Sequence, residues 1–236
     1  MVERAARPLL VAEMFGPTVQ GEGPSTGQQA VFVRLSRCNL SCPPCDTPFT
    51  WDTSRYDLRT ETQRLPGEQV VAWVLAQTAP LVVITGGEPL LQQEVLVPVV
   101  ASLTAAGRRV EIETNGTIAP TANLQRLVSA FNVSPKLATF AAATDDHRRI
   151  NPTALGALMA GGKAVFKFVV HGTDDLAEVD QLCTAYGLGP VWVMPEGTTA
   201  QQVVAVSQAV ANDVVRRGWN LSSRLHVLCW GDQRGR

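Results

Sequence analysis

The sequence predicts an α/β fold in which helices cover a mostly parallel sheet, and three observations lead to this prediction. Short runs of β-branched residues alternate with longer stretches of helical periodicity along most of the chain. The run Leu81-Val82-Val83-Ile84 has no polar face, which is typical of a parallel strand covered on both sides. A length of 236 residues, 45% of them hydrophobic, suits one large barrel-type domain. The pattern leaves an open doubly wound sheet, a full barrel and a partial barrel as alternatives.

The expected elements alternate between strand and helix. Each expected strand is a short, mainly apolar run, and each expected helix is a longer segment in which apolar residues recur at helical spacing. In chain order, the strands are expected at Ala30–Ser36, Leu81–Thr85, Arg109–Thr114, Phe131–Ser134, Ala164–Val170, Val191–Met194 and Leu225–Trp230. The helices between them are expected at Gly67–Gln77, Leu90–Ala106, Ala122–Ala130, Pro152–Ala160, Asp175–Tyr186 and Thr199–Arg217.

Two loops flank the first of these strands, Ala30–Ser36. The segment Arg37–Pro66 shows no periodicity, and a loop of that length in a compact domain is usually functional. The segment Gly16–Gly27 is rich in glycine and proline. Because both loops adjoin the same strand, they can face one site.

Side chains alternate along a strand, which orients the residues of Ala30–Ser36. Arg34 should therefore share a face with Phe32 and Ser36, while Val33 and Leu35 point to the other side.

The charge balance excludes two classes of partner. The chain has 20 Lys and Arg against 21 Asp and Glu, for a net charge of −1, which gives no footprint for nucleic acid and no polybasic membrane patch. No run of 18 apolar residues occurs, so a membrane span is not expected. In the N-terminal stretch Met1–Ala12, Glu13 follows before a secretion signal core could form. We therefore expect a cytoplasmic protein.

The five cysteines are unevenly placed. Cys38, Cys42 and Cys45 fall within eight residues in a C-x3-C-x2-C spacing, whereas Cys183 and Cys229 stand alone and are interpreted as small core residues. An odd count without a secretion signal argues against a disulfide framework and favours metal binding or catalysis. A structural zinc site would need a fourth ligand, which the loop lacks, whereas three thiolates can hold a four-iron cluster with one iron open. The spacing favours the cluster, with zinc and unligated thiols as alternatives.

The triplet resembles that of the radical S-adenosylmethionine (SAM) enzymes, in which the open iron of a [4Fe-4S] cluster binds the amino and carboxylate groups of SAM. A second motif agrees: Thr85-Gly86-Gly87-Glu88-Pro89 follows an expected strand and is similar to the GGEP turn that binds the amino group of SAM in that superfamily. Glycines let the backbone approach the ligand, and Glu88 can complement an ammonium group. The resemblance implies a modified, incomplete (β/α) barrel formed as a single domain by residues 1–236.

Further segments resemble one family within this superfamily, the 7-carboxy-7-deazaguanine synthases, over nearly the whole chain. The segments that carry the resemblance are 13–23, 32–35, 45–51, 113–116, 134–136, 167–170 and the late His226. The resemblance implies a substrate loop at 13–27 and a cluster loop at 37–66. It also implies a lyase that rearranges 6-carboxy-5,6,7,8-tetrahydropterin to 7-carboxy-7-deazaguanine with loss of ammonia, in the route to queuosine and other deazapurines. A reduced cluster would cleave SAM, and the resulting 5′-deoxyadenosyl radical would take hydrogen from carbon 6 of the pterin. The implied partners are an electron donor such as flavodoxin or ferredoxin, and a second copy in a homodimer.

The resemblance also implies roles for individual residues. Cys38, Cys42 and Cys45 would hold the cluster, and Thr47 would hold magnesium, which keeps much of its hydration. The residues implied for SAM are Asp46, Gly86, Gly87, Glu88, Ser134, Pro135, Lys136, Lys167, Phe168, Val169 and Val170. The residues implied for the pterin are Val19, Gln20, Gly21, Glu22, Arg34, Thr85 and His226, with Arg34 as a two-bond partner for the substrate carboxylate.

Taken without the family, the same residues have simpler interpretations. Arg34 could make an ordinary ion pair, and Gln20 and Glu22 could be solvated loop residues. Thr47 could be a turn residue before proline, and His226 a structural histidine within an apolar strand. Lys136 and Lys167 could also be solvated.

Two features depart from the wider superfamily pattern. Pro44 stands where an aromatic residue often precedes the third cysteine, so contact with adenine would fall to backbone, Phe49 or Trp51. The C-terminal residues 231–236 match no substrate-binding terminus and are left without a role. Two rival functions stay open: a glycyl-radical activating enzyme, which would act on a protein and need no Gln20–Glu22 loop, and a zinc-binding interaction module.

Overall fold

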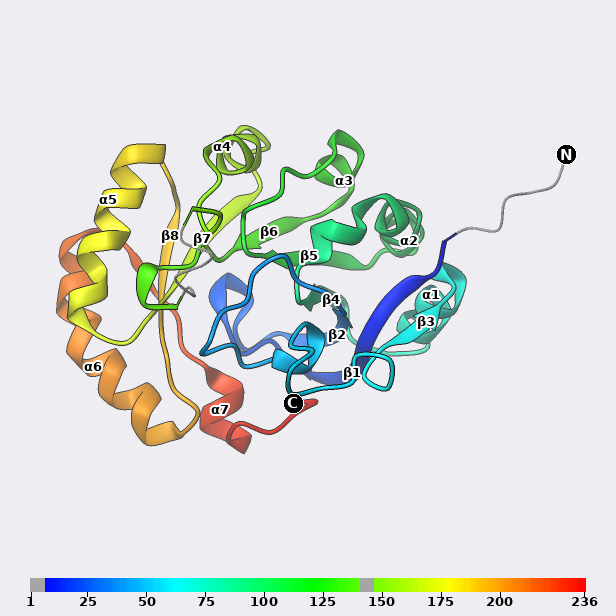
Figure 1. The fold of residues 1–236 in the computed structure, drawn as a ribbon, viewed down its shortest axis with the longest axis horizontal. Coiled ribbons are helices and arrows are strands. Elements are labelled where there is room, and N and C mark those ends of the chain that lie inside the picture. The colour runs from blue at the N-terminus through cyan, green and yellow to red at the C-terminus, as the bar shows by residue number, and fades with distance from the viewer. Residues whose placement is uncertain (1–6, 141–146) are drawn as a thin grey trace, which may run out of the picture.

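A nine-stranded sheet organises the chain, in a computed structural model that describes residues 7–140 and 147–236. Its strand order is β3-β1-β2-β4-β5-β6-β7-β8-β9 (Figure 1). The strands are β1 (Leu9–Val19), β2 (Gln29–Leu35), β3 (Gln63–Leu65), β4 (Leu81–Gly86), β5 (Arg109–Thr114), β6 (Ala130–Val133), β7 (Ala164–Val170), β8 (Val191–Pro195) and β9 (Asn220–Leu221).

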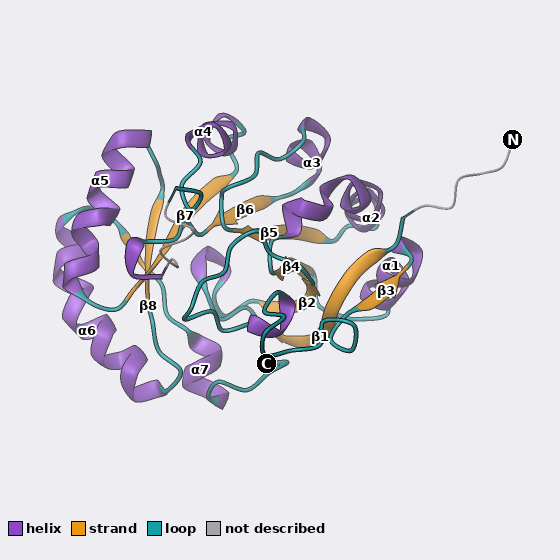
Figure 2. Cartoon of the chain, in the orientation of Figure 1, coloured by secondary structure: helices purple, strands orange, loops and turns teal. Residues whose placement is uncertain are grey.

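The strands from β2 to β9 pair in parallel, whereas β1 is antiparallel to both β2 and β3. Helices connect the parallel strands and cover the convex face of the curved sheet (Figure 2). They are α1 (Gly67–Leu75), α2 (Gln93–Ala105), α3 (Ala122–Leu127), α4 (Pro152–Ala160), α5 (Leu176–Tyr186) and α6 (Ala200–Arg216), and α7 (Leu225–Trp230) follows β9. Within the described residues no ladder joins β9 to β3, so the fold is an incomplete barrel, as predicted. No described helix is long and apolar enough to cross a membrane.

Local sequence signals set the ends of several helices. Asn151 caps α4 by accepting hydrogen bonds from the N–H groups of Thr153 and Ala154. Thr199 and Gln202 form a capping box at the start of α6. These caps satisfy donors that have no partner inside a helix.

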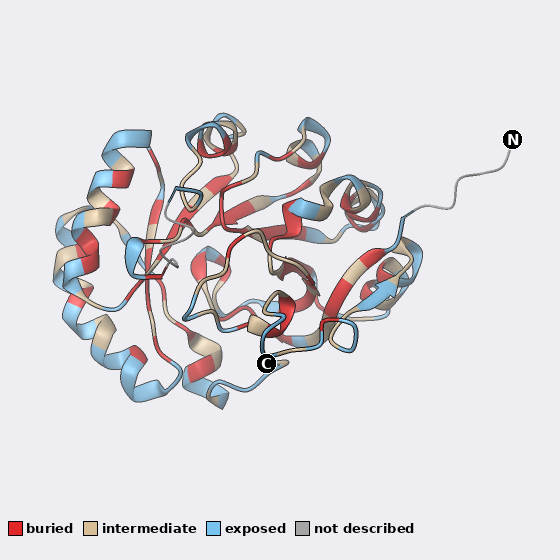
Figure 3. Cartoon of the chain, in the orientation of Figure 1, coloured by how far each residue is buried: buried red, intermediate tan, exposed pale blue. Residues whose placement is uncertain are grey.

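Alternation along β2 separates two apolar regions. Val31, Val33 and Leu35 join the large core between the sheet and its helices. Ala30 and Phe32 face the concave side, where they pack with residues of β4. The buried residues accordingly line the strands and the inner sides of the helices (Figure 3). Arg34 follows Phe32 on the concave side, which confirms the predicted orientation of this strand.

Strand β1 was not expected from the sequence. It extends through residues 13–19, so the substrate loop expected at 13–27 is corrected and begins after Val19. A register shift between Phe15 and Thr18 lets the strand continue across the Gly16-Pro17 dipeptide. A Cβ atom at Gly16, whose φ is +117°, would lie 2.9 Å from the carbonyl oxygen of Ala30. The glycine that suggested a loop instead allows close pairing with β2.

The sequence prediction was wrong for Leu225–Trp230, which forms helix α7 and not a strand. A short apolar run does not distinguish a buried strand from a helix by periodicity. Here the main-chain N–H of Leu225 donates to the carbonyl of Gly21, and the short β9 occupies the end of the sheet instead. Only Val227 of α7 is buried, and Cys229 is exposed, contrary to its interpretation as a core residue.

Smaller differences concern element ends. The helix expected from Leu90 begins at Gln93, after a 3-10 turn over Pro89–Gln92. The helix expected at Ala122–Ala130 ends at Leu127, because Ala130 already belongs to β6. Within the cluster loop, 37–66, only the 3-10 turn Pro48–Thr50 and the strand β3 are regular among the elements described.

Candidate active site

A cavity of about 610 Å³ lies on the concave side, at the C-terminal ends of the parallel strands. In α/β barrels this is the end at which active-site loops gather. The cavity is lined by most of the residues predicted from the sequence: Val19, Gln20, Gly21, Glu22, Arg34, Cys38, Cys42, Cys45, Asp46, Thr47, Thr85, Gly86, Gly87, Ser134, Lys136, Lys167, Val169 and His226. Glu88, Pro135, Phe168 and Val170 are the predicted residues that do not line it.

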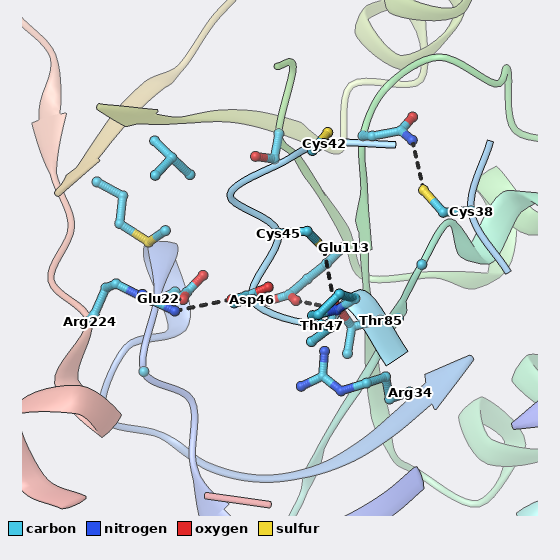
Figure 4. Close-up of a pocket in the computed structure, with 18 of the residues that line it drawn as sticks. Glu22, Arg34, Cys38, Cys42, Cys45, Asp46, Thr47, Thr85, Glu113 and Arg224 are labelled. Atoms are coloured by element: carbon cyan, nitrogen blue, oxygen red, sulfur yellow. Dashed lines mark hydrogen bonds and ion pairs between the residues drawn. The ribbon is translucent and has the colours of Figure 1, made fainter. Parts of the chain in front are cut away.

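The three cysteines of the cluster loop lie half-buried along the wall of this cavity (Figure 4). The N–H of Leu40 donates to Sγ of Cys38 at 3.5 Å, and the side-chain amide of Asn115 lies 4.0 Å from the same sulfur. Burial raises the pKa of the Cys38 thiol to about 12, because a thiolate there loses hydration. A bound metal would supply the missing positive charge and hold the thiolate form.

The donor set fits a cluster better than a single ion. Among the described residues, no three His, Cys, Asp or Glu side chains converge on one point. A four-iron cluster does not require convergence, because each thiolate binds a different iron. A tetrahedral zinc site does require it, and a fourth ligand as well.

The Gly-Gly-Glu turn is shaped first by the neighbouring backbone. A Cβ atom at Gly86 would lie 2.1 Å from the carbonyl oxygen of Leu35, and one at Gly87 would lie 2.0 Å from that of Arg37. The two glycines therefore let β4 pass directly beside the start of the cluster loop. Both residues also line the cavity.

Glu88 differs from its expected role. Its carboxylate is fully buried and accepts hydrogen bonds from the N–H of Leu90 (2.9 Å), the hydroxyl of Thr114 (2.8 Å) and the N–H of Asn115 (2.7 Å). Burial raises the pKa of this carboxyl group. Its oxygens hold protein donors and are not presented to the cavity.

Glu22 is the centre of a buried charge network whose members line the cavity. Its carboxylate pairs with Lys167 of β7, lies 3.3 Å from Nε of Arg224, and lies 4.0 Å from Nε2 of His226. Burial acts to raise the pKa of Glu22, but Lys167 and Arg224 outweigh it and hold that pKa far below its usual range. Gln20 anchors the loop by donating to Glu113 at 3.0 Å. The solvated alternative for Glu22 and Lys167 is therefore excluded.

Arg224 was missed by the sequence analysis. Its three nitrogens contact Glu22, the carbonyl of Gly197 (2.7 Å) and Asp46 (3.1 Å), and its side chain is 7% exposed. It thus joins the substrate loop, the loop after β8 and the cluster loop, as Figure 4 shows for Glu22 and Asp46. A single arginine before His226 forms no pattern in the sequence, so its partners appear only once the chain is folded.

Arg34 makes an ordinary ion pair and also faces the cavity, so the structure is consistent with both interpretations of this residue from the sequence. Its Nε lies 2.7 Å from Oε1 of Glu13, so it makes the ordinary ion pair. Its guanidinium also lines the cavity and points toward Thr85 and Thr47 (Figure 4). Ser36, expected on the same face, does not reach the cavity and instead bonds to the hydroxyl of Thr62 at 2.7 Å.

Two threonines lie on the same wall as Arg34. The hydroxyl of Thr47 lies 3.6 Å from Sγ of Cys45, and Thr47 is 8% exposed. The hydroxyl of Thr85 donates to Oε2 of Glu113 at 2.7 Å. A hydroxyl, nearby carboxylates and space for water form a donor set of the kind that magnesium prefers.

The remaining predicted SAM residues lie around β6 and β7. Lys136 donates to the hydroxyl of Ser134 at 3.1 Å, and Val169 lines the cavity beside them. Phe168 and Val170 point to the opposite side of β7 and are fully buried in the main core. Alternation along the strand explains this split.

Aromatic and C-terminal residues complete the lining. Phe49 and Trp51 reach the cavity, as proposed for the loss of an aromatic residue at Pro44, and Phe140 reaches it as well. Asp232 and Arg236, from the segment that was left without a role, also line it.

Comparisons with known proteins agree with this geometry. Residues 33–178 match the radical SAM superfamily. The chain is 36% identical over 230 residues to a 7-carboxy-7-deazaguanine synthase of Pyrobaculum aerophilum, covering 96% of both chains. It is 35% identical to one of Hyperthermus butylicus, covering 93% of this chain and 92% of that one.

Two solved structures are similar to this chain. The crystal structure of QueE from Escherichia coli is similar, with a TM-score of 0.66, 27% identity, and coverage of 91% of this chain and 93% of that one. Streptococcus suis SuiB shares the fold alone, with a TM-score of 0.53 and 13% identity over 79% of this chain and 46% of SuiB.

Proposed function

Because the chain belongs to the 7-carboxy-7-deazaguanine synthase family of radical SAM enzymes, we propose that its cavity binds the pterin substrate beside the cluster loop. The enzyme is a lyase that converts 6-carboxy-5,6,7,8-tetrahydropterin to 7-carboxy-7-deazaguanine with loss of ammonia. It uses a [4Fe-4S] cluster, SAM and magnesium. One observation carries the proposal: the cysteine triplet and the Gln20–Glu22 loop open onto the same cavity.

Cys38, Cys42 and Cys45 would hold the cluster, and together with SAM it supplies the radical chemistry. The proposed SAM site runs from Asp46 and the Gly86-Gly87 turn to Ser134, Lys136, Lys167 and Val169, all of which line the cavity. Glu88 would act behind this wall by fixing the turn and the Thr114–Asn115 segment. Pro135, Phe168 and Val170 support the wall, with their side chains outside the cavity.

The substrate would lie between Arg34 and the Glu22 network. Arg34 presents its terminal nitrogens to the substrate carboxylate, in the two-bond geometry that a guanidinium favours. Gln20 and Glu22, with backbone at Val19 and Gly21, would read the donor and acceptor edge of the pterin. Thr85 and His226 would supply further polar contacts, and the cavity walls would limit the access of water to the reacting atoms.

Thr47 would place magnesium between the cluster loop and the substrate. Its hydroxyl lies next to the last cluster ligand and on the same wall as Arg34. A single protein hydroxyl binds magnesium weakly, because this ion gives up its waters reluctantly. Substrate oxygens would therefore complete the site.

Three further proposals rest on the family. Because radical SAM chemistry needs an electron, a small redox protein such as flavodoxin or ferredoxin would be the donor. We also propose that one domain carries the whole activity, that the enzyme acts as a homodimer, and that it works in the cytoplasm.

The experiment that tests the function is anaerobic turnover. The protein with reconstituted cluster should convert 6-carboxytetrahydropterin to 7-carboxy-7-deazaguanine in the presence of SAM, magnesium and a strong reductant. A protein that cleaves SAM but leaves the pterin unchanged would contradict the assignment and favour an activating enzyme. One zinc per chain, without iron or sulfide after anaerobic purification, would leave only the interaction module.

A further inference from the structure

The C-terminal tail, residues 231–236, returns to the cluster loop and to β1 (Figure 1). Arg234 makes the contacts that hold it there. Its Nε lies 2.9 Å from Oε2 of Glu13, and its terminal nitrogens lie 3.2 and 3.3 Å from Oε2 of Glu61. The guanidinium carbon also lies 3.8 Å from the centre of the Phe49 ring. One arginine thus joins the tail to β1 and to two parts of the cluster loop.

Glu13 divides its two carboxylate oxygens between two arginines. Oε1 accepts from Nε of Arg34 at 2.7 Å, and Oε2 accepts from Nε of Arg234 at 2.9 Å. Arg34 therefore uses only its Nε on Glu13, and its terminal nitrogens have no hydrogen-bond acceptor among the described residues. Those nitrogens are the ones that the cavity can offer to a ligand.

Arg34 and Glu13 could also pair in another way. If Oε2 of Glu13 were vacant, Arg34 could form two parallel bonds to the carboxylate, which is the preferred geometry of an arginine-carboxylate pair. One terminal nitrogen would then be occupied, and the guanidinium would turn toward β1. Because Arg234 already donates to Oε2, a nitrogen of Arg34 would have to share this oxygen with a second guanidinium and approach its positive charge, so Arg234 disfavours this arrangement.

We propose that Arg234 is a positioning residue for Arg34: by occupying Oε2 of Glu13, it keeps the terminal nitrogens of Arg34 directed into the cavity. The inference rests on the proposed function in one respect, the assignment of the substrate carboxylate to Arg34. Arg234 itself does not line the cavity, so it acts through Glu13 and not by touching the substrate. The tail thereby becomes part of the substrate specificity of the site.

The kinetic test compares Arg234→Ala in two backgrounds. In the parent enzyme with cluster and SAM, Arg234→Ala should raise KM for the pterin about 10-fold, with a smaller effect on kcat, because a weakened ground-state contact appears mainly in KM. Iron content and substrate-free cleavage of SAM should not change. In the Glu13→Gln background the same change should alter KM less than about 2-fold, because an amide has only one acceptor oxygen and cannot form the two-bond pair.

Two further variants are controls. Arg234→Lys keeps a cation at Oε2 of Glu13 and should restore KM to within about 3-fold of the parent. Arg216→Ala removes an exposed arginine that pairs with Asp213 on α6 and does not line the cavity, so it should leave KM unchanged. An unchanged KM in Arg234→Ala, or an equal rise with and without Glu13→Gln, would overturn the proposal and make the tail a simple structural strap.

A structural measurement separates this inference from the proposed function. A crystal structure of Arg234→Ala should show two nitrogens of Arg34 on the two oxygens of Glu13, whether or not the pterin is the substrate. An Arg34 side chain that stays as in the parent would overturn the inference even if turnover is confirmed. A parent enzyme that fails to convert the pterin would instead contradict the proposed function, while this structure still decides the inference.

Discussion

Glu22 and Arg224 lie 3.3 Å apart although 202 positions separate them in the chain. The pair crosses the open side of the barrel, between the loop after β1 and the segment before α7. Two backbone contacts reinforce it: the N–H of Gly23 donates to the hydroxyl of Ser222 at 2.7 Å, and the N–H of Leu225 donates to the carbonyl of Gly21 at 2.9 Å. These contacts close the cavity where the sheet does not.

We expect Arg224→Ala to lower the free energy of unfolding by about 3 kcal/mol at pH 7, because it removes one of the two cations that pair with the buried Glu22 carboxylate and leaves the carbonyl of Gly197 without its donor. Denaturant unfolding of the variant and the parent measures this loss. Arg216→Ala, which removes an exposed arginine paired with Asp213 within one helix, should change the same quantity by less than about 0.5 kcal/mol. A loss for Arg224→Ala no larger than this control would contradict the prediction.

Each of the variants Cys38→Ala, Cys42→Ala and Cys45→Ala should abolish the four-iron cluster and SAM cleavage, since three thiolates are the minimum for a cluster with one open iron. Iron and acid-labile sulfide analysis after anaerobic reconstitution gives the readout. Cys183, which packs against the main core, and the exposed Cys229 are the matched controls, and their alanine variants should keep the cluster. Cluster loss in either control, with the fold intact, would contradict the assignment.

Arg34→Lys should reduce kcat/KM for the pterin by about 30- to 1,000-fold, or about 2–4 kcal/mol, because lysine keeps the charge but loses the two-bond geometry. The cluster content and the slow cleavage of SAM without substrate should survive, since neither needs the substrate carboxylate. Steady-state kinetics with saturating SAM decides the point. Turnover at the parent rate would show that Arg34 only pairs with Glu13 and does not bind the substrate carboxylate.

Thr47→Ala should weaken the response of turnover to added magnesium while the iron content stays normal, because it removes the proposed protein hydroxyl ligand. Thr47→Ser keeps a hydroxyl at this position and should largely restore the response. A magnesium titration of the initial rate compares the three proteins. If Thr47→Ala responds like the parent, Thr47 does not belong to the magnesium site.

The stability of the protein should depend on pH through His226. Burial lowers the pKa of this histidine below its ordinary value of 6.5, although Glu22 acts to raise it. At pH values above 6.5 both the folded and the unfolded chain hold a neutral histidine, so the group adds no pH dependence there. Below pH 6.5 the unfolded chain takes up a proton first, so stability falls by at most about 1.4 kcal/mol per pH unit until the folded pKa is reached.

The measurement is the free energy of unfolding at a series of pH values from 7.5 to 5.5, for the parent and for His226→Gln. The variant cannot take up this proton, so its curve should be flatter below pH 6.5. Parallel curves over this range would show that His226 titrates alike in the folded and unfolded chain.

Periodicity was sufficient for most of the parallel sheet and its helices, because the pattern of apolar residues reports which faces are buried. It failed at β1, where Gly16 and Pro17 resemble a loop and a register shift carries the strand past them. It also failed at Leu225–Trp230, where the choice between strand and helix depends on contacts with the distant Gly21. Both errors concern segments whose conformation is fixed by residues far away in the chain.

The residues of the candidate site also fall into those that the sequence could predict and those that it could not. Motifs of fixed spacing, such as the cysteine triplet and Gly86-Gly87, were readable because their members are neighbours in sequence. Arg224, Phe140 and Arg236 were not, since each gains its position only from the fold. Glu88 shows the converse: its motif was recognised, but only the structure shows that its oxygens are used by protein donors.

The contacts between residues 20–25 and residues 222–226 set the order in which the parts of the site can form during synthesis. At about 5–20 residues per second, the ribosome makes Arg224 roughly 10 to 40 seconds after Glu22, its partner 202 positions earlier. During that interval the ribosome makes Lys167, the earlier in sequence of the two cations that pair with Glu22. The cavity gains its last wall only when the end of the chain arrives, so incomplete chains carry the cysteine triplet but no closed site.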